Sequence, residues 1–377
     1  MPPLHLLIKP ASSACNLRCQ YCFYADVSAH RETRFYGFMS EELLAILVRR
    51  ALEEAEGSCT FAFQGGEPTL VGLDFYRRLI DLQKTYNKKR IPIHNAIQTN
   101  GVDLDDSWAS FLAENRFLVG LSLDGYRELQ DFMRTDPQGK GSYDAVMRTA
   151  TSFDRYGVQY NILCVVNRYV ARHPQKVYRA LRHFGYLQFI PCLDGFDAEK
   201  QPYSLTPQDY GHFLKSVFDL YYRDFIDGRP VSVRDFDNYI QMLLGMPPEA
   251  CGMNGICSCS FTVEGDGSVF PCDFYVLDAF RLGNLRDMSF SDMRNSEAAL
   301  AFLRPSRHVR EECRACPWFH LCRGGCRRYR EPFSDGLPGR NMFCDAYRAF
   351  FSYAYPRLAE CAQICGRRLR AQGQPPH

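Results

Sequence analysis

The sequence lacks a long hydrophobic run, a strong excess of one charge and a visible export signal. Its longest apolar stretches, residues 117–123 and 160–166, are far shorter than the roughly 20 residues that a membrane-spanning helix needs. The 45 Lys and Arg residues nearly balance the 43 Asp and Glu residues, which argues against a main role in binding nucleic acid or a membrane. No basic segment precedes the first apolar residues, so we expect a cytoplasmic protein.

Cysteine, by contrast, is abundant, with 17 residues in a chain of 377. Disulfides are typical of exported proteins, whereas thiols at this density in a reducing cytosol more often bind metal. Some of the cysteines are expected to be small apolar core residues. The spacing of the others therefore carries the functional information.

Short apolar segments alternate with amphipathic ones over the first half of the chain. The amphipathic segments carry apolar residues at three- and four-residue steps, which predicts helices, and the apolar segments predict buried strands. This alternation is typical of βα units around a parallel sheet. The six predicted strands are residues 4–9, 59–64, 93–98, 118–123, 158–166 and 187–191.

Polar or glycine-rich sequences follow five of these six strands, which favours a barrel whose loops converge on one pocket over an open sheet. The pattern ends after residue 193, and strand-like pieces recur only at residues 260–263 and 268–271. We therefore expect a partial (β/α)6 barrel in residues 1–232. Residues 233–377 are expected to form a linker helix and a small cysteine-rich domain.

Cys15, Cys19 and Cys22 form a C-x3-C-x2-C motif directly after the first predicted strand. Three thiolates could hold a structural zinc ion completed by a distant residue, although this spacing is not a common one for zinc. They could also hold three irons of a four-iron cluster. The fourth position would then be open to another ligand, as it is in catalytic metal sites.

This motif, with an aromatic residue before its last cysteine and with Gly65-Gly66-Glu67-Pro68 after the second strand, resembles the radical S-adenosylmethionine enzymes. The resemblance implies a [4Fe–4S] cluster whose open iron binds the amino and carboxylate groups of S-adenosylmethionine. A guanidinium suits the cofactor's carboxylate. The resemblance places Tyr21 beside the adenine, Gly66 at the amino group, Ser122 near the ribose, Arg134 at the carboxylate and Leu193 on the base.

Eleven cysteines follow residue 246, and eight of them resemble the pattern of a SPASM domain. Zinc is the alternative for the C-x2-C pair. Cys259, separated by one residue from Cys257, could replace it as a ligand, and Cys361 and Cys365 have no assigned role. The resemblance implies two further [4Fe–4S] clusters, one held by Cys251, Cys257, Cys272 and Cys326 and the other by Cys313, Cys316, Cys322 and Cys344.

Residues 1–10, 61–70 and 266–275 resemble the anaerobic sulfatase-maturating enzymes in particular. The resemblance implies that a 5′-deoxyadenosyl radical starts the oxidation of a cysteine or serine in a sulfatase polypeptide to Cα-formylglycine. The auxiliary clusters would accept the second electron, and flavodoxin or ferredoxin would supply electrons. Asp273 follows the predicted ligand Cys272 and is the candidate general base. Tyr24 and Gln64 are placed near the substrate side chain.

Two alternatives remain at this point. A different SPASM enzyme could form thioether or carbon–carbon crosslinks in a peptide. A non-catalytic iron–sulfur electron carrier or a zinc-dependent scaffold belongs to another class, and it would have no need for an open three-cysteine site.

Overall fold

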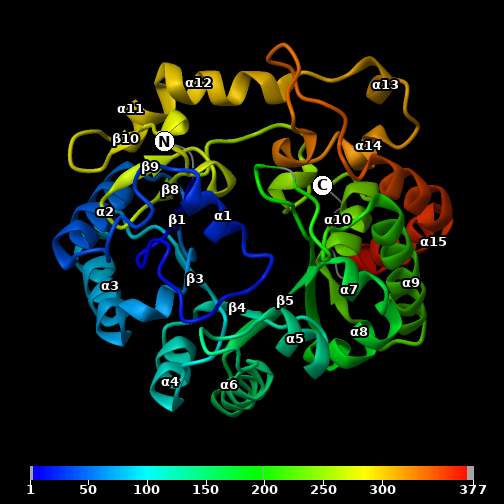
Figure 1. Ribbon diagram of the computed structural model, residues 1–377, viewed down its shortest axis with the longest axis horizontal. Coiled ribbons are helices and arrows are strands. Elements are labelled where there is room, and N and C mark those ends of the chain that lie inside the picture. The colour runs from blue at the N-terminus through cyan, green and yellow to red at the C-terminus, as the bar shows by residue number, and fades with distance from the viewer. Residues whose placement is uncertain (1–2, 198, 372–377) are drawn as a thin grey trace.

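The computed structural model describes residues 3–197 and 199–371, and one ten-stranded sheet organises this part of the chain (Figure 1). The strand order is β10-β9-β8-β1-β2-β3-β4-β5-β6-β7. The strands are β1 (Leu4–Ile8), β2 (Cys59–Phe63), β3 (Ile93–Thr99), β4 (Leu118–Ser122), β5 (Gln159–Val166), β6 (Tyr186–Pro191), β7 (Ser232–Val233), β8 (Thr262–Val263), β9 (Ser268–Phe270) and β10 (Gly283–Asn284).

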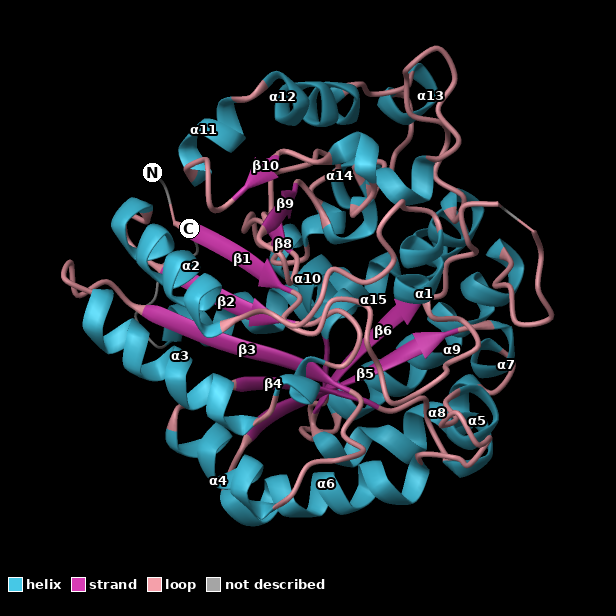
Figure 2. Cartoon of the chain, turned by 60° about the vertical axis from the view of Figure 1, so that its left-hand side comes forward, coloured by secondary structure: helices cyan, strands magenta, loops and turns pink. Residues whose placement is uncertain are grey.

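Strands β1 to β7 pair in chain order and are all parallel. The six predicted strands are confirmed to within one residue at each end, and β7 adds a short seventh strand. Because parallel strands need crossover connections, helices follow them, and α3, α4 and α6 lie along the outer side of the sheet (Figure 2). The predicted α/β class with a parallel sheet is confirmed.

The helices begin where the sequence offers caps and an apolar stripe. Ser40, Asp105 and Thr206 each accept a backbone hydrogen bond at the start of α2, α4 and α9. The helices are α1 (Phe23–Ala29), α2 (Glu41–Glu54), α3 (Leu73–Tyr86), α4 (Asp106–Glu114), α5 (Arg127–Met133), α6 (Tyr143–Tyr156), α7 (Arg168–Ala171), α8 (Pro174–Leu181), α9 (Pro207–Ile226), α10 (Arg234–Leu243), α11 (Phe290–Asn295), α12 (Glu297–Leu303), α13 (Glu311–Arg314), α14 (Phe319–Cys322) and α15 (Cys344–Ala371). Over the described residues, none of them has the length and apolar character to span a bilayer.

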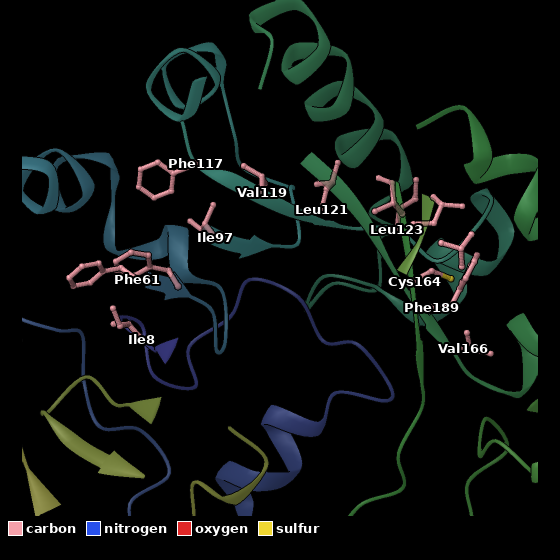
Figure 3. Close-up of a cluster of buried hydrophobic side chains, with 14 of the residues drawn as sticks. Ile8, Phe61, Ile97, Phe117, Val119, Leu121, Leu123, Cys164, Val166 and Phe189 are labelled. Atoms are coloured by element: carbon pink, nitrogen blue, oxygen red, sulfur yellow. The ribbon is translucent and has the colours of Figure 1, made fainter. Parts of the chain in front are cut away.

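The core fills the space between the sheet and its outer helices, and Figure 3 shows strand residues that contribute to it. Phe61 and Phe63 are fully buried on one face of β2, and the Phe63 ring packs edge-on against Tyr76 of α3. Cys59 and Cys164 lie in the same core, so these two cysteines have the structural role expected for them. Successive strand residues point to opposite faces, which leaves the inner face for polar residues.

The C-terminal region joins the same sheet. β8 pairs in parallel with β1, and β9 and β10 extend that edge with antiparallel pairs. The expected domain boundary between residues 232 and 233 falls inside β7. The long helix α15 lies beside α9 and α10 (Figure 1), where Phe350 contacts Phe218 and Phe236. The two parts therefore share one sheet and one hydrophobic core.

Candidate active site

Four polar side chains line the inner side of the sheet at the carboxyl ends of β1 to β4. They are Lys9, Gln64, Gln98 and Ser122, and each follows the strand alternation that turns neighbours such as Phe63 toward the outer helices. Gln98 Nε2 donates to Ser122 Oγ at 3.2 Å. The loops that follow these strands, including the predicted cysteine loop, meet at this edge.

The cysteine loop packs on the Gly65-Gly66 turn that follows β2. The backbone N–H of Gly66 donates to the Ser12 carbonyl at 2.9 Å, and that of Glu67 donates to Ala14 at 2.8 Å. A Cβ atom on Gly66 would lie 2.0 Å from the Ala14 oxygen, so the close approach requires glycine here. The turn therefore holds the cysteine loop.

Glu67 fixes the ends of β2 and β3 under this loop. Its fully buried carboxylate accepts hydrogen bonds from the Thr99 hydroxyl and the Asn100 backbone N–H, both at 2.8 Å. Asn100 in turn donates to Asn16 Oδ1 at 2.7 Å, and its amide lies 3.8 Å from Cys15 Sγ. Burial raises the pKa of Glu67, while these hydrogen bonds oppose the shift.

Cys15, Cys19 and Cys22 lie close enough within this loop to influence one another's ionisation. Burial, with a smaller contribution from negative charge on Cys22, raises the pKa of Cys15 to about 11 and that of Cys19 to about 12. A buried set of thiolates needs a positively charged group to replace its protons. Three thiols, with no fourth thiol beside them among the described residues, fit an iron–sulfur cluster with one open iron.

Tyr21 and Arg134, two of the residues predicted to contact the cofactor, meet at a carboxylate, Asp124, to which the sequence assigned no individual role. The Tyr21 hydroxyl and Arg134 Nε both donate to Asp124 Oδ2, the latter at 2.9 Å. Asp124 is fully buried two residues after β4, and its Oδ1 accepts from the Val165 N–H at 2.8 Å. The positive charge of Arg134 also lowers the pKa of Cys19 against the effect of burial. Arg134 is therefore held beside the cysteine loop by an ion pair.

The other two predicted cofactor contacts lie at the same edge of the sheet. Ser122 ends β4 and is 8% exposed, and the half-buried Leu193 follows β6 by two residues. Parallel strands bring their carboxyl ends together, so both residues are on the cofactor side of the sheet expected from the sequence. Their contacts with the cofactor stay predictions.

Tyr24, Gln64 and Asp273 form a hydrogen-bonded triad from three distant parts of the chain. The Tyr24 hydroxyl, on α1, and Gln64 Nε2 each donate to Asp273 Oδ2 at 2.8 Å. Gln64 Nε2 also donates to the Tyr24 hydroxyl at 2.7 Å. The structure thus brings together the three residues predicted to act on the substrate, which the sequence separates by more than 200 positions.

The second oxygen of Asp273, Oδ1, is buried and has no hydrogen-bond partner among the described residues. Burial raises the pKa of Asp273, whereas Lys9 and the two hydrogen bonds lower it. Lys9, which sequence reasoning missed, lies 3.1 Å from Glu264 and 4.9 Å from the centre of the Tyr24 ring. A carboxylate with a raised pKa and one free oxygen is suited to accept a proton near neutral pH.

The eight C-terminal thiols fall into two groups in space. In the first group, burial and negative charge on Cys257 and Cys251 raise the pKa of Cys326, and burial and negative charge on Cys326 and Cys257 raise the pKa of Cys272. The second group comprises Cys313, Cys316, Cys322 and Cys344. Burial and negative charge on the other three thiols of this group raise the pKa of Cys322. The resemblance assigns the same two sets to two clusters, and their role as cluster ligands stays a prediction. In the described part of the chain, no three Cys, His, Asp or Glu side chains surround a point as a single metal ion requires.

Cys259 lies apart from both groups. Burial raises its pKa to about 12, and its charged neighbour is Arg294 rather than another cysteine. Cys361 is buried on α15, and its charge neighbours include Cys365, one turn further along the helix. The geometry thus favours Cys257 over Cys259 as a member of the first group.

Two family models match this chain. Residues 10–180 match the radical SAM superfamily, and residues 251–317 match SPASM, an iron–sulfur cluster-binding domain. The first match covers the cysteine loop and strands β2 to β5, and the second begins at Cys251. The protein is therefore a radical S-adenosylmethionine enzyme with a SPASM domain, and its cofactors are S-adenosylmethionine and iron–sulfur clusters.

Individual relatives define the family more narrowly. A cysteine-type anaerobic sulfatase-maturating enzyme of Clostridium perfringens is 51% identical over 96% of this chain and 99% of its own length. A serine-type enzyme of Bacteroides thetaiotaomicron is 30% identical over 94% of this chain and 90% of its own length. A solved structure of native anSMEcpe with bound AdoMet and Kp18Cys peptide is 49% identical, covers 96% of this chain and all of that chain, and has a TM-score of 0.93. The chain belongs to the family of anaerobic sulfatase-maturating enzymes, as the sequence predicted.

Proposed function

We propose that this protein oxidises a cysteine of a sulfatase polypeptide to Cα-formylglycine and that Asp273 is the general base. The observation that carries the proposal is the triad of Tyr24, Gln64 and Asp273 beside Cys272, in which one carboxylate oxygen is left free. A crosslinking enzyme or an electron carrier is the weaker alternative, because the chain is 51% identical to a sulfatase-maturating enzyme over nearly its whole length.

Three [4Fe–4S] clusters are part of the proposal. Cys15, Cys19 and Cys22 would hold the open one, and the two groups of four C-terminal thiols would hold the others. Around the open cluster, S-adenosylmethionine would contact Tyr21, Gly66, Ser122, Arg134 and Leu193. The grouping of the thiols supports this assignment, because thiolates are the usual ligands of such clusters.

When bound, S-adenosylmethionine and the open cluster would supply the abstraction of a hydrogen atom from Cβ of the target, and the auxiliary clusters would accept one electron. Asp273 takes the thiol proton through its free oxygen, which completes a two-electron oxidation of the target to a thioaldehyde. Water then replaces the sulfur, which leaves as hydrogen sulfide, and the aldehyde of formylglycine remains. Tyr24 and Gln64 fix the Asp273 side chain by donating to its other oxygen. Lys9 places a positive charge close to the triad and favours the ionised base before the proton arrives.

Cysteine is proposed as the preferred target residue over serine. The chain is 48 to 51% identical to three relatives of the cysteine type and 30% identical to relatives of the serine type. A flavodoxin or ferredoxin is the proposed electron donor. The solved relative with a bound peptide supports a sulfatase segment as the substrate.

Anaerobic incubation with S-adenosylmethionine, a reductant and three matched sulfatase peptides tests this function. The peptides carry Cys, Ser or Ala at the target position, and product mass is measured together with 5′-deoxyadenosine. We expect formylglycine from the Cys peptide, less from the Ser peptide and none from the Ala peptide. Formation of 5′-deoxyadenosine with an unchanged Cys peptide would contradict the proposal.

A further inference from the structure

A buried arginine lies near thiols of both C-terminal groups. Arg330 ends a short 3-10 helix (Arg327–Arg330) that begins directly after Cys326, and it is only 5% exposed. Its Nη2 donates to the Gly255 carbonyl at 3.1 Å, two residues before Cys257. Among the described residues no carboxylate lies within ion-pair distance of it, and its Nε is buried without a hydrogen-bond partner.

The neighbours of Arg330 come from both thiol groups. Burial lowers the pKa of Arg330, and negative charge on Cys257, Cys326 and Cys313 opposes that shift. The first two thiols belong to the group that includes Cys272, and Cys313 belongs to the other group. Arg330 and Cys313 also line one small cavity together. A single guanidinium therefore faces both sets of thiols.

Arg328, two residues before Arg330, has a different environment. Arg328 pairs with Glu331 at 3.7 Å and donates to the Asp194 carbonyl at 3.2 Å, so its charge is balanced nearby. A buried cation without a counter-charge is unfavourable. The charge of Arg330 is therefore best balanced by negative charge located where the thiols are.

Iron–sulfur clusters fit this need, because a cluster gains negative charge when it is reduced and its potential depends on nearby charges and hydrogen bonds. We propose that Arg330 raises the reduction potential of both auxiliary clusters and so makes them better electron acceptors. This inference rests on the proposed function for the origin of the electron. One electron leaves the substrate for an auxiliary cluster, and the accompanying proton goes to Asp273.

The test uses a chain in which Cys15, Cys19 and Cys22 are all replaced by Ala, so that only auxiliary clusters remain after anaerobic reconstitution. Iron content and reduction potentials are measured by redox titration with electron paramagnetic resonance. We expect Arg330→Met to retain about eight irons per chain. We also expect it to lower the equilibrium constant for one-electron reduction about tenfold, which corresponds to a downward shift of about 59 mV.

Two further variants serve as controls. Arg330→Lys keeps the charge and should leave the potentials near those of the parent, and Arg328→Gln removes an already paired charge and should do the same. Unchanged potentials in a fully loaded Arg330→Met chain would overturn the proposal.

Arg330→Gln, which keeps a donor for the Gly255 carbonyl, replaces Arg330→Met if that chain does not load. Loss of iron in both neutral variants, with full loading of Arg330→Lys, would overturn the redox role and assign Arg330 to cluster assembly. No substrate is present in these titrations, so their result is independent of formylglycine formation. A shifted potential in the titrated chain, together with a wild-type protein that makes no formylglycine, would reject the proposed function alone.

Discussion

The loop after β1 and the C-terminal array hold their thiols in different ways. Cys15, Cys19 and Cys22 lie within eight consecutive residues, and hydrogen bonds from the turn after β2 fix their loop. The thiols of the array come instead from several segments between Cys251 and Cys344. Cys272 lies near Cys326 only because the chain folds back on itself. The first site is therefore set by local sequence, whereas the second depends on tertiary structure.

The charges around the two regions differ as well. Beside the cysteine loop, Arg134 is paired with Asp124. Beside the array, Arg330 is buried with no carboxylate partner among the described residues. Three thiols leave one iron open for an organic ligand, and four leave none. The comparison suggests that the loop generates the radical and the array receives an electron, and each prediction below tests that division.

The largest effect is expected from replacing all three loop cysteines by Ala. Formation of 5′-deoxyadenosine should be abolished, while about eight irons per chain remain on the array, because the two regions share no ligand. Iron analysis and product analysis of the anaerobically reconstituted protein measure both quantities. If the array lost its iron too, the division between the regions would be wrong.

Asp273→Asn should separate the radical step from the oxidation that follows it. Asparagine can accept the hydrogen bond from Tyr24 but cannot take up a proton, so formylglycine formation should fall by about 10²- to 10⁴-fold. Formation of 5′-deoxyadenosine should stay within a few-fold of wild type, since the cysteine loop is untouched. Equal loss of both products would indicate that Asp273 supports the fold of the site rather than the proton transfer.

Unfolding of Asp273→Asn and of wild type by denaturant is the control that shows whether the variant is folded. Burial raises the pKa of Asp273 in the folded state, so ionisation destabilises the fold once the pH rises above the unfolded-state value. At neutral pH, Asp273→Asn should therefore unfold at an equal or slightly higher denaturant concentration than wild type. The difference should disappear at a pH below the unfolded-state pKa, where both residues are neutral.

A pair of cysteine variants sharpens the description of the array. Cys257→Ala removes a member of the first thiol group and should lower the iron content by up to four per chain. Cys259→Ala removes a buried thiol whose charged neighbour is Arg294, and it should leave the iron content unchanged. Iron loss in the second variant but not in the first would exchange the roles of these residues.

Gly66→Ala should have the smallest effect of the series and should affect only the loop. The new Cβ must displace the Ala14 carbonyl, and strain of this kind costs about 1–3 kcal/mol. We expect S-adenosylmethionine to bind about tenfold more weakly, measured by equilibrium binding to the reconstituted protein. Gly366→Ala on α15, where the nearest atom is a flexible Leu244 methyl at 3.2 Å, is the matched control and should bind normally.

Much of the fold could be read from the sequence because buried parallel strands are nearly continuous apolar runs. All six long strands were found in this way. β7 was missed because two residues carry no pattern, and α5 and α7 were missed because they are too short for a clear apolar stripe. The short helices follow strands β4 and β5, where tertiary contacts rather than propensity decide the conformation.

The site residues could be predicted where they belong to a local sequence motif. They could be predicted less well where their role depends on residues distant in the sequence. The cysteine loop and the Gly65-Gly66 turn are such motifs, and the resemblance they carry led to Tyr24, Gln64 and Asp273. Asp124 and Lys9 were missed because their roles depend on ion pairs with Arg134 and Glu264, which no local spacing reveals. Both are charged residues at the end of a buried strand, and that position is the signal that could have identified them.

The central claim is that the loop's radical attacks Cβ of a substrate cysteine whose oxidation Asp273 then completes. A sulfatase peptide with deuterium at both Cβ positions of the target cysteine tests it most directly. Mass analysis should find one deuterium in 5′-deoxyadenosine and the other in the formylglycine aldehyde. Formation of 5′-deoxyadenosine without deuterium, or of an aldehyde that retains neither label, would contradict the account.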